Sequence, residues 1–388
     1  MRLLPFEYAV RNLGRSPLRL AMSLLGSALV VSLIIAATAF VRGMENSLTR
    51  SGSPSNVILL GAGSEESIER SEIGMSVPTQ AAASIRGLRE RMGVDFVSPE
   101  VHMALGVSLS ADTEPVGQAV VRGVTPKAFL VHPQLRIADG RMFHSGEDEL
   151  IIGELASTRL GVKDEAVAVG RSIWIDGRKL KIVGRFEAPN TVMNAELWMP
   201  LGNLQIITRR ESLSCVVLTL EEAEPADVEA FAAQRLDLEL VAMRESDYYR
   251  KLSAFYKPVR GMVWVTAILI ALGGIFGGLN TMYAAFAARV REIGMLQSLG
   301  YPRRAIVLSF VQESVLAAAA GSLIASTFCL LVLDGLAVRF SMGAFGLVLD
   351  GTTMAVGLAS GLLLGLAGSI PPTAQSLRMP ITEALKAT

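Results

Sequence analysis

Charged residues are scarce in this sequence. Asp, Glu, Lys and Arg make up 19% of its 388 residues, whereas an ordinary soluble protein has about 25%. The 36 basic and 36 acidic residues give a formal net charge of zero, which argues against a global basic field that would attract nucleic acid. Hydrophobic residues reach 51% instead. A membrane protein is therefore the first expectation.

Motifs that carry chemistry are also missing. The sequence has no Gly-Lys dipeptide, so it lacks the phosphate-binding loop GxxxxGK[ST], and it has no GxSxG motif. His102, His132 and His144 show no HExxH or other short zinc-ligand spacing, so a metal site would need distant residues to converge. Cys215 and Cys329 lie in a polar region and an apolar run, and we expect both to be free packing residues. The sequence thus predicts a chain without catalytic residues, metal ligands or a cofactor of its own.

Four apolar runs are long enough as helices to cross a hydrocarbon core, which takes about 20 residues. They begin near residues 20, 261, 305 and 347, and the Pro-Pro pair at 371–372 is expected to end the last one. The second run carries Gly273, Gly274, Gly277 and Gly278, which leave one face flat enough for close approach of another helix. This pattern predicts one span, a long insertion and then three spans.

The first run has a rival interpretation as a secretory signal peptide, because "ATA" at 37–39 imitates a cleavage site. About 19 residues precede the run, and the run itself is longer than the usual 7 to 15 residues of a signal core. We therefore favour an uncleaved span.

The positive-inside rule sets the expected orientation. Arginines precede the first run and lie between the second and third, and basic residues follow the fourth, whereas the loop at 334–346 holds only Arg339. Both termini and the segment at 289–304 are predicted to be cytoplasmic. The insertion between the first two runs is then extracytoplasmic.

The insertion is expected to be an α+β domain. Seven short β-rich segments bounded by turn residues predict strands, and helices are expected at 79–92 and 225–236. The Asp176-Gly177 pair predicts a hairpin turn. Residues 244–260 have helical spacing and read as a stalk, with Pro258 as an expected kink.

Glu313 is unusual because it lies near the end of an apolar run, where a carboxylate is costly. Two interpretations stay open for it. It is either a hydrogen-bond partner or proton site inside the protein, or it lies at the membrane interface, and the interface is favoured.

The segment "RVREIGMLQSLGYPRRAI" at 289–306 resembles the motif around the cytoplasmic coupling helix of ABC-transporter permeases of the MacB, FtsX and LolC type. Four further segments are similar to this family: "YAVRNLGRSPLRLAMSLLG" at 8–26, "VVRGVTPKAFL" with the stretch at 138–162, "VQESVLAAAAGSLIA" at 311–325, and "MPITEALKA" at 379–387. The similarity covers nearly the whole chain and is weakest at 57–119 and 221–244. After "RLGV" the family often has a Gly-Asp pair, whereas this chain continues with "KDEAVAVGRS".

The resemblance implies a type VII, mechanotransmission permease subunit of the bacterial inner membrane: four transmembrane helices (1+3) with an inserted periplasmic core-like α+β domain. It implies that the permease pairs with a second copy or a paralogue and with two ATPase subunits, which bind the ATP and Mg. A periplasmic or outer-membrane component and membrane lipids are further expected partners. The implied action is export or extraction of lipid, lipoprotein, peptide or drug. The alternative is an FtsX-like regulator of a cell-wall hydrolase or sensor kinase that transports nothing.

The implied ATPase contact lies on the coupling helix, and its residues are Arg289, Arg291, Glu292, Ile293, Gly294, Leu296, Leu299 and Gly300. On a helix, Ile293, Leu296 and Leu299 form an apolar stripe that suits either a partner groove or the lipid interface. An Arg289–Glu292 pair on the helix is a purely structural role for these two charges.

The expected division of the chain is as follows. It comprises a cytoplasmic amphipathic helix (1–19), a first span (20–42), the extracytoplasmic domain (43–243), the stalk (244–260), a second span (261–288), the coupling helix (289–304), a third span (305–333), an external loop (334–346), a fourth span (347–371) and a cytoplasmic tail (372–388).

Overall fold

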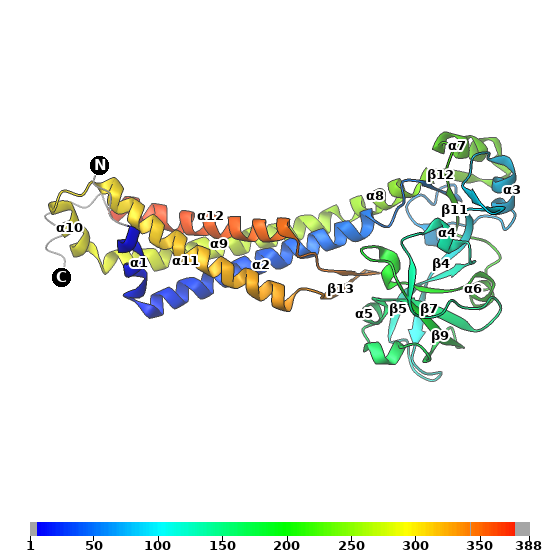
Figure 1. Ribbon diagram of the computed structural model, residues 1–388, viewed down its shortest axis with the longest axis horizontal. Coiled ribbons are helices and arrows are strands. Elements are labelled where there is room, and N and C mark those ends of the chain that lie inside the picture. Colours follow the sequence, from blue (N-terminus) through cyan, green and yellow to red (C-terminus); the bar gives the residue numbers. More distant parts are fainter. Residues whose placement is uncertain (1–5, 342, 377–388) are drawn as a thin grey trace. The chain divides into compact units, whose positions relative to one another are not determined.

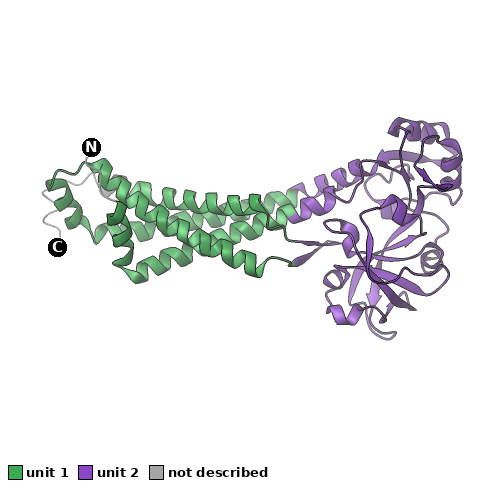
Figure 2. Cartoon of the chain, in the orientation of Figure 1, with its two compact units in different colours: residues 1–42, 258–336, 347–388 green, residues 43–257, 337–346 purple. Residues whose placement is uncertain are grey.

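The computed structural model describes residues 6–341 and 343–376, and these form two compact units (Figures 1 and 2). Unit 1 contains residues up to 42, 258–336 and those from 347 onward, and unit 2 contains residues 43–257 and 337–346. The "MPITEALKA" segment and the basic residues after the fourth run lie outside the described residues.

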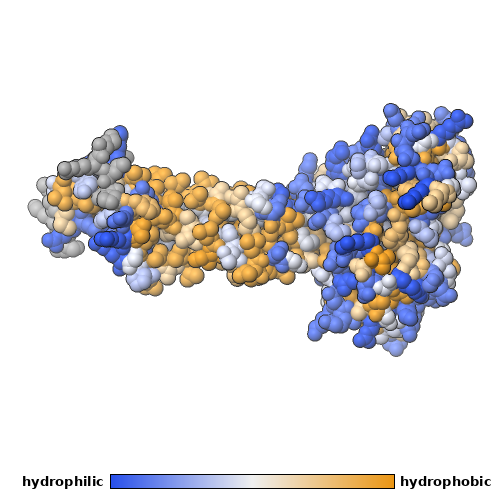
Figure 3. All heavy atoms as spheres, viewed as in Figure 1, coloured by the Kyte–Doolittle hydropathy of each residue, from blue (hydrophilic) through white to orange (hydrophobic). Residues whose placement is uncertain are grey.

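Unit 1 is built from helices (Figure 1). Four of them are long and apolar enough to cross a membrane, and Figure 3 shows the apolar residues that cover their visible face. The helices are α1 (Phe6–Gly14), α2 (Pro17–Thr49), α9 (Lys257–Ala287), α10 (Val290–Ser298), α11 (Arg303–Val332) and α12 (Gly351–Ser376). The four long helices lie where the apolar runs predict them.

One expectation about proline is wrong, because Pro371 and Pro372 lie inside α12, which continues to Ser376. Near Pro258 the helical path is interrupted at Tyr256, where α8 (Glu245–Phe255) has ended and α9 has not yet begun at Lys257. Pro258 is thus the second residue of a new helix, where its missing N–H costs nothing.

Glycine packing holds the helices of unit 1 together. A Cβ on Gly321 of α11 would lie 2.9 Å from the backbone oxygen of Leu24 in α2, so the two backbones leave no space for a side chain. A Cβ on Gly365 of α12 would lie 2.9 Å from the Cβ of Ala318 in α11. Such close approach is the usual route to helix association in lipid.

The predicted glycine face of α9 splits into two. A Cβ on Gly274 would meet Val30 of α2 at 2.9 Å, and Gly278 lies beside Gly368 of α12. Among the described residues, Gly273 and Gly277 have no such neighbour within 4 Å. Within this part of the chain, therefore, only Gly274 and Gly278 of the four glycines contact another helix.

Within the described residues, unit 2 has one large mixed sheet of ten strands. Its main order is β12-β1-β11-β4-β5-β10-β7-β9-β6, with β8 paired to β4 and β9. The strands are β1 (Asn56–Gly61), β4 (Val97–Ser108), β5 (Gly117–Val124), β6 (Arg136–Gly140), β7 (Glu149–Gly153), β8 (Ser172–Ile175), β9 (Arg178–Glu187), β10 (Leu197–Pro200), β11 (Cys215–Thr219) and β12 (Leu240–Arg244). The pairs β5–β10 and β7–β9 are parallel and the others antiparallel, as in an α+β domain.

Short helices and two small hairpins complete unit 2. The α-helices are α3 (Val77–Ser84), α4 (Ala128–Val131), α5 (Ala156–Leu160), α6 (Leu201–Thr208), α7 (Pro225–Gln234) and α8. The small hairpins are β2–β3 (Glu90–Arg91, Val94–Asp95) and β13–β14 (Ala337–Phe340, Gly343–Gly346). The segment at 334–346, expected to be a plain loop, thus contains a hairpin that belongs to unit 2.

All seven predicted strand segments are strands, and the turn between β8 and β9 is the predicted one. Asp176 and Gly177 both have positive φ, 49° and 75°, as a type I′ hairpin turn requires. The helix expected at 79–92 ends at Ser84, and its last part forms β2 instead. Three strands of the large sheet are not predicted from the sequence, β4, β6 and β12, and β4 is the one that carries Glu100 and His102.

Candidate functional site

The predicted coupling segment forms a short helix, α10, between α9 and α11 (Figure 1). Arg289 is the residue before its first turn, and the backbone N–H of Leu299 closes its last turn. Gly300 follows with a φ of +86°, a left-handed conformation that glycine adopts readily and that ends a helix. The helix is therefore shorter than the predicted segment at 289–304.

One face of α10 packs against its own unit. Ile293 is 4% exposed and belongs to an apolar cluster with Phe286, Ile306 and Phe310. The rings of Phe286 and Phe310 lie 4.3 Å apart, and the Arg289 guanidinium lies 5.9 Å from the Phe310 ring. This cluster joins the end of α9, α10 and the beginning of α11.

Glu292 fixes α10 to α1. Its Oε1 accepts hydrogen bonds from the Tyr8 hydroxyl at 2.7 Å and from Arg15 Nη1 at 2.9 Å. Burial acts to raise the pKa of Glu292, but the bonds from Tyr8 and Arg15 hold it below its usual value. Glu292 thus bonds to Tyr8 and Arg15 in place of the predicted pair with Arg289, and Arg289 forms an ion pair with Glu313.

Glu313 of α11 binds two arginines from different parts of unit 1. One carboxylate oxygen accepts from Arg19 Nη2 at 2.7 Å, and the other accepts from Arg289 Nη1 at 3.0 Å. The side chain of Glu313 is only 7% exposed, and Arg289 also donates to the backbone oxygen of Asn12. Glu313 is thus a buried hydrogen-bond partner, as one of the two interpretations expects, and it joins α2, α11 and the start of α10.

The opposite face of α10 is exposed. Arg291 and Ser298 are exposed, and Met295 and Leu299 are 47% and 68% exposed. Two apolar side chains and one cation on so small a surface fit a partner groove or a lipid interface.

The predicted contact residues therefore divide between two faces. Arg291, Leu299 and Gly300 are exposed, and Leu296 is half-buried. Arg289, Glu292, Ile293 and Gly294 are committed to contacts within unit 1 or buried by them. Met295 is exposed beside Leu299 although the family motif does not single it out. Contact of this surface with an ATPase stays a prediction.

Unit 2 contains a buried charged cluster that the sequence does not predict. Arg122 of β5 is 2% exposed and forms a bidentate pair with Glu196, with distances of 2.7 and 2.8 Å. Its Nη1 donates to Glu100 of β4 at 2.9 Å, and Trp198 Nε1 donates to Glu196 at 2.8 Å. Burial opposes the charged form of every member, but Glu196 and Glu100 keep the pKa of Arg122 well above its usual value. Arg122 is thus a permanent cation in the core of unit 2.

Two histidines flank Glu100 in this cluster. His132 Nε2 lies 3.0 Å from Glu100 Oε1, and its Nδ1 lies 3.8 Å from Glu245 at the start of α8. Burial acts to lower the pKa of His132, but Glu100 raises it above the usual value. His102 Nε2 lies 3.1 Å from Glu100 Oε2, and burial and Arg122 lower its pKa.

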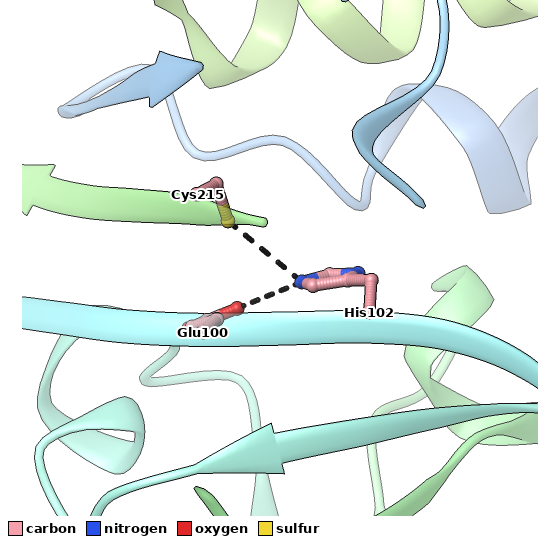
Figure 4. Close-up of side chains that lie close together, drawn as sticks. All are labelled: Glu100, His102 and Cys215. Atoms are coloured by element: carbon pink, nitrogen blue, oxygen red, sulfur yellow. Dashed lines mark hydrogen bonds and ion pairs between the residues drawn. The ribbon is translucent and has the colours of Figure 1, made fainter. Parts of the chain in front are cut away.

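Glu100, His102 and Cys215 meet at one point (Figure 4). Cys215 Sγ lies 3.8 Å from His102 Nε2, and one ligand atom of each residue lies within 4.8 Å of the others. Both cysteines are free and buried, as predicted. The sequence gives one usable signal for this group, the Glu-x-His spacing of a strand whose alternate residues share a face. The missing information is that β11 lies beside β4.

A cavity of about 230 Å³ adjoins the cluster within unit 2. His102, Arg122 and Glu196 contribute to one part of its wall, and Tyr248 and Phe345 are among its aromatic lining residues. A space large enough for water molecules therefore lies beside charges that are otherwise buried.

Two family models match the chain. The model described as the MacB-like periplasmic core domain matches residues 20–235, which is more than half of the chain. The model described as the FtsX-like permease C-terminal domain matches residues 264–381.

Curated relatives agree with these models. The ABC transporter permease YknZ of Bacillus subtilis (strain 168) is 23% identical over 394 residues, which covers 95% of each chain. The macrolide export ATP-binding/permease protein MacB of Shewanella sp. (strain W3-18-1) is 22% identical over 98% of this chain and 60% of its own length. The MacB protein of Bordetella avium (strain 197N) is 24% identical over 81% of this chain and 50% of its own length. The chain thus spans about half to three fifths of the MacB relatives.

Two solved structures are similar to part of the chain. The periplasmic region of MacB from Actinobacillus actinomycetemcomitans matches 52% of this chain and 94% of that region, with 11% identity and a TM-score of 0.39. The extracellular domain of YknZ from Gram-positive bacteria matches 48% of this chain and 99% of that domain, with 14% identity and a TM-score of 0.36. The family models and the full-length relatives carry the assignment: the chain belongs to the MacB/FtsX type of ABC-transporter permease.

Proposed function

We propose that this permease receives mechanical work from a separate ATPase subunit at the exposed face of α10, and that unit 1 passes it toward the extracytoplasmic domain. The observation that carries the proposal is the division of α10 into an outward face, with Met295 and Leu299, and an inward face bonded to its own unit. A helix that only anchored the chain in lipid would not need the hydrogen bonds that join its inward face to the rest of unit 1.

The hydrogen bonds of the inward face connect α10 to other helices of unit 1, so a displacement of α10 can be transmitted to them. Movement of α10 acts on α1 through Glu292, and on α11 and α2 through Arg289 and Glu313. Charge-assisted hydrogen bonds are short and directional, so they transmit a displacement better than apolar contacts that slide. α2 and α9 each continue beyond the apolar run they contain, to Thr49 and back to Lys257.

Partner and orientation follow from the same proposal. Two ATPase subunits act on a pair of permeases in the inner membrane, with α10 and both termini on the cytoplasmic side. A second permease packs on α9. Only 6% of the most apolar stretch of α9 is buried, against 33–44% of the corresponding stretches in the other three long helices. The exposed Gly273 and Gly277 lie on this helix and suit close packing. The substrate class is lipid, lipoprotein, peptide or drug.

The test changes the outward face alone. Met295→Glu with Leu299→Glu places two acids where an apolar contact is proposed. Replacing contact residues of this kind costs 2 kcal/mol or more at an interface centre, which corresponds to roughly 30-fold weaker binding. We expect the double variant to lose co-purification with the ATPase subunit and to lose permease-stimulated ATP hydrolysis.

The matched control is Met92→Glu with Leu236→Glu, because both side chains are exposed apolar residues of unit 2, at 92% and 81%. The control should keep full stimulation and co-purification. Ile293 is unsuitable for this test, because a charge in its buried position would disturb the fold of unit 1. Full stimulation by the Met295/Leu299 variant would overturn the proposed contact.

A further inference from the structure

Three side chains with different ligand atoms lie on one face of two paired strands in unit 2. Glu100 and His102 are two residues apart on β4, so they point to the same side of the sheet. Cys215 is the direct antiparallel partner of Glu100 on β11 and points to that side as well. A carboxylate, an imidazole and a thiol are thus grouped by rigid sheet geometry and not by a loop.

Two of the three distances between the ligand atoms lie near the edges of a metal tetrahedron. Zn²⁺ binds imidazole nitrogen and carboxylate oxygen at about 2.0–2.2 Å and sulfur at about 2.3 Å, which gives edges of roughly 3.3 Å for N···O and 3.5 Å for N···S. The observed distances are 3.1 Å from His102 Nε2 to Glu100 Oε2 and 3.8 Å from His102 Nε2 to Cys215 Sγ. The third edge, from a Glu100 oxygen to Cys215 Sγ, is at most 4.8 Å, so coordination requires the side chains to close on the ion.

The groups around the three residues resemble the outer shell of a metal site. A carboxylate that binds a metal is usually held by further hydrogen bonds, and Glu100 is held by Arg122 at 2.9 Å and His132 at 3.0 Å. Each carboxylate oxygen has two lone pairs, so Oε2 can accept from Arg122 and still bind a cation. The bidentate pair with Glu196 offsets the positive charge of Arg122.

Access and selectivity follow from the surroundings. Glu100 and Cys215 are fully buried, whereas His102 also lines the 230 Å³ cavity, which gives an ion a route to the site. Two of the three ligands are nitrogen and sulfur, which favour zinc and its neighbours over the oxygen-seeking Mg²⁺ and Ca²⁺. With three protein ligands, the fourth position of a tetrahedron falls to water or a small ligand.

We propose that Glu100, His102 and Cys215 form a binding site for a borderline-soft divalent metal ion, with Zn²⁺ the best fit. Cys215 binds as the thiolate and releases its proton to solvent. The ion cross-links β4 and β11. The site is independent of the proposed ATPase contact, because all its residues belong to unit 2 and the test needs no ATP.

The test uses the purified full chain in detergent, stripped of metal with a chelator and titrated with Co²⁺ as a spectroscopic substitute for Zn²⁺. Thiolate coordination gives a sulfur-to-cobalt charge-transfer band in the near ultraviolet, which oxygen and nitrogen ligands do not produce. We expect this band to saturate at one Co²⁺ per chain and to disappear when one equivalent of Zn²⁺ is added.

Cys329→Ser identifies the sulfur, because Cys329 is the only other cysteine of the chain. This variant should keep the full band, and the result does not depend on whether a change at Cys215 disturbs folding. Cys215→Ser should lose the band, and His102→Gln should weaken Co²⁺ binding by at least about 100-fold, more than a lost outer-shell contact costs. His144→Gln removes an exposed histidine and should leave binding unchanged.

Two outcomes overturn the site. One is the absence of a charge-transfer band in the Cys329→Ser variant at saturating Co²⁺. The other is the same metal content and affinity in folded Cys215→Ser and wild type, which would mean that the metal binds elsewhere on the surface.

Discussion

Glu313→Gln is the change that most directly tests the proposed route from α10 into unit 1. Glutamine keeps the shape of the side chain and one acceptor oxygen, but it removes the negative charge that both Arg19 and Arg289 require. The side chains of these arginines are 21% and 10% exposed, so water replaces the lost partner only in part. Two cations then lie close together without a counter-charge.

The expected cost is large for a single atom replacement. Removing one partner of a buried ion pair typically costs about 3–5 kcal/mol, because the remaining charge stays buried. For a unit of this size, 1 kcal/mol corresponds to roughly 2–4 °C in Tm. We therefore expect Glu313→Gln to lower the Tm of the detergent-solubilised chain by roughly 6–20 °C. Glu7→Gln, an exposed acid on α1, is the matched control and should change Tm little.

A triple variant separates stability from coupling. Replacing a whole buried ion triad by apolar residues of similar volume is often neutral or stabilising, so Arg19→Met, Glu313→Met and Arg289→Met together should restore Tm to near the wild-type value. The directional bonds would still be missing. We therefore expect the triple variant to bind the ATPase subunit but to show little permease-stimulated ATP hydrolysis in proteoliposomes. Normal stimulation in this variant would refute the role of the triad, and an unchanged Tm in Glu313→Gln would refute its burial cost.

Two further predictions concern the two units separately. Gly321→Ala should destabilise unit 1 by about 1–3 kcal/mol, because the new methyl group would lie 2.9 Å from the Leu24 backbone oxygen, whereas Gly26→Ala on α2 meets no neighbour among the described residues and should be neutral or slightly stabilising. Thermal unfolding of both variants in detergent measures the difference, and equal Tm values would contradict the packing argument. Arg122→Gln leaves two buried carboxylates without their cation and should destabilise unit 2 by about 3–5 kcal/mol, whereas Arg91→Gln changes an exposed arginine and should have almost no effect. Near-ultraviolet circular dichroism during denaturant unfolding measures this pair, and an Arg122→Gln variant as stable as its control would contradict the assigned charge pairing.

Features that are determined by residues close together in the sequence could be predicted. The four long apolar helices, the strand segments and the Asp176-Gly177 turn all arise from local periodicity or from one local backbone requirement. The wrong expectation of a helix end at Pro371 was also local. Proline loses one hydrogen bond and clashes with the preceding turn, but a long packed helix tolerates this in lipid, and at the start of a helix the cost disappears.

The orientation of α10 could not be predicted, because the apolar stripe of a short helix does not say which surface covers it. The sequence predicts that Ile293 and Leu299 belong to one contact surface. In the structure, Phe310 and Ile306 of α11 pack against Ile293, whereas Leu299 stays exposed. Only the path of α11 decides this, and that path depends on packing over the whole of unit 1.

The buried charged cluster of unit 2 also depends on contacts that the local sequence does not determine. Its ion pairs join residues that are far apart in the chain, such as Arg122 with Glu196, and the Pro, Glu and His residues of β4 break the apolar pattern that is typical of a buried strand. Such a strand is stable in the core only if every polar group on it finds a partner, so its sequence looks like a loop until the partners are known. The polar residues of β4 are therefore the ones that hold the charged centre of unit 2 together, and they place His102 and Glu100 opposite Cys215 where a metal ion can be tested.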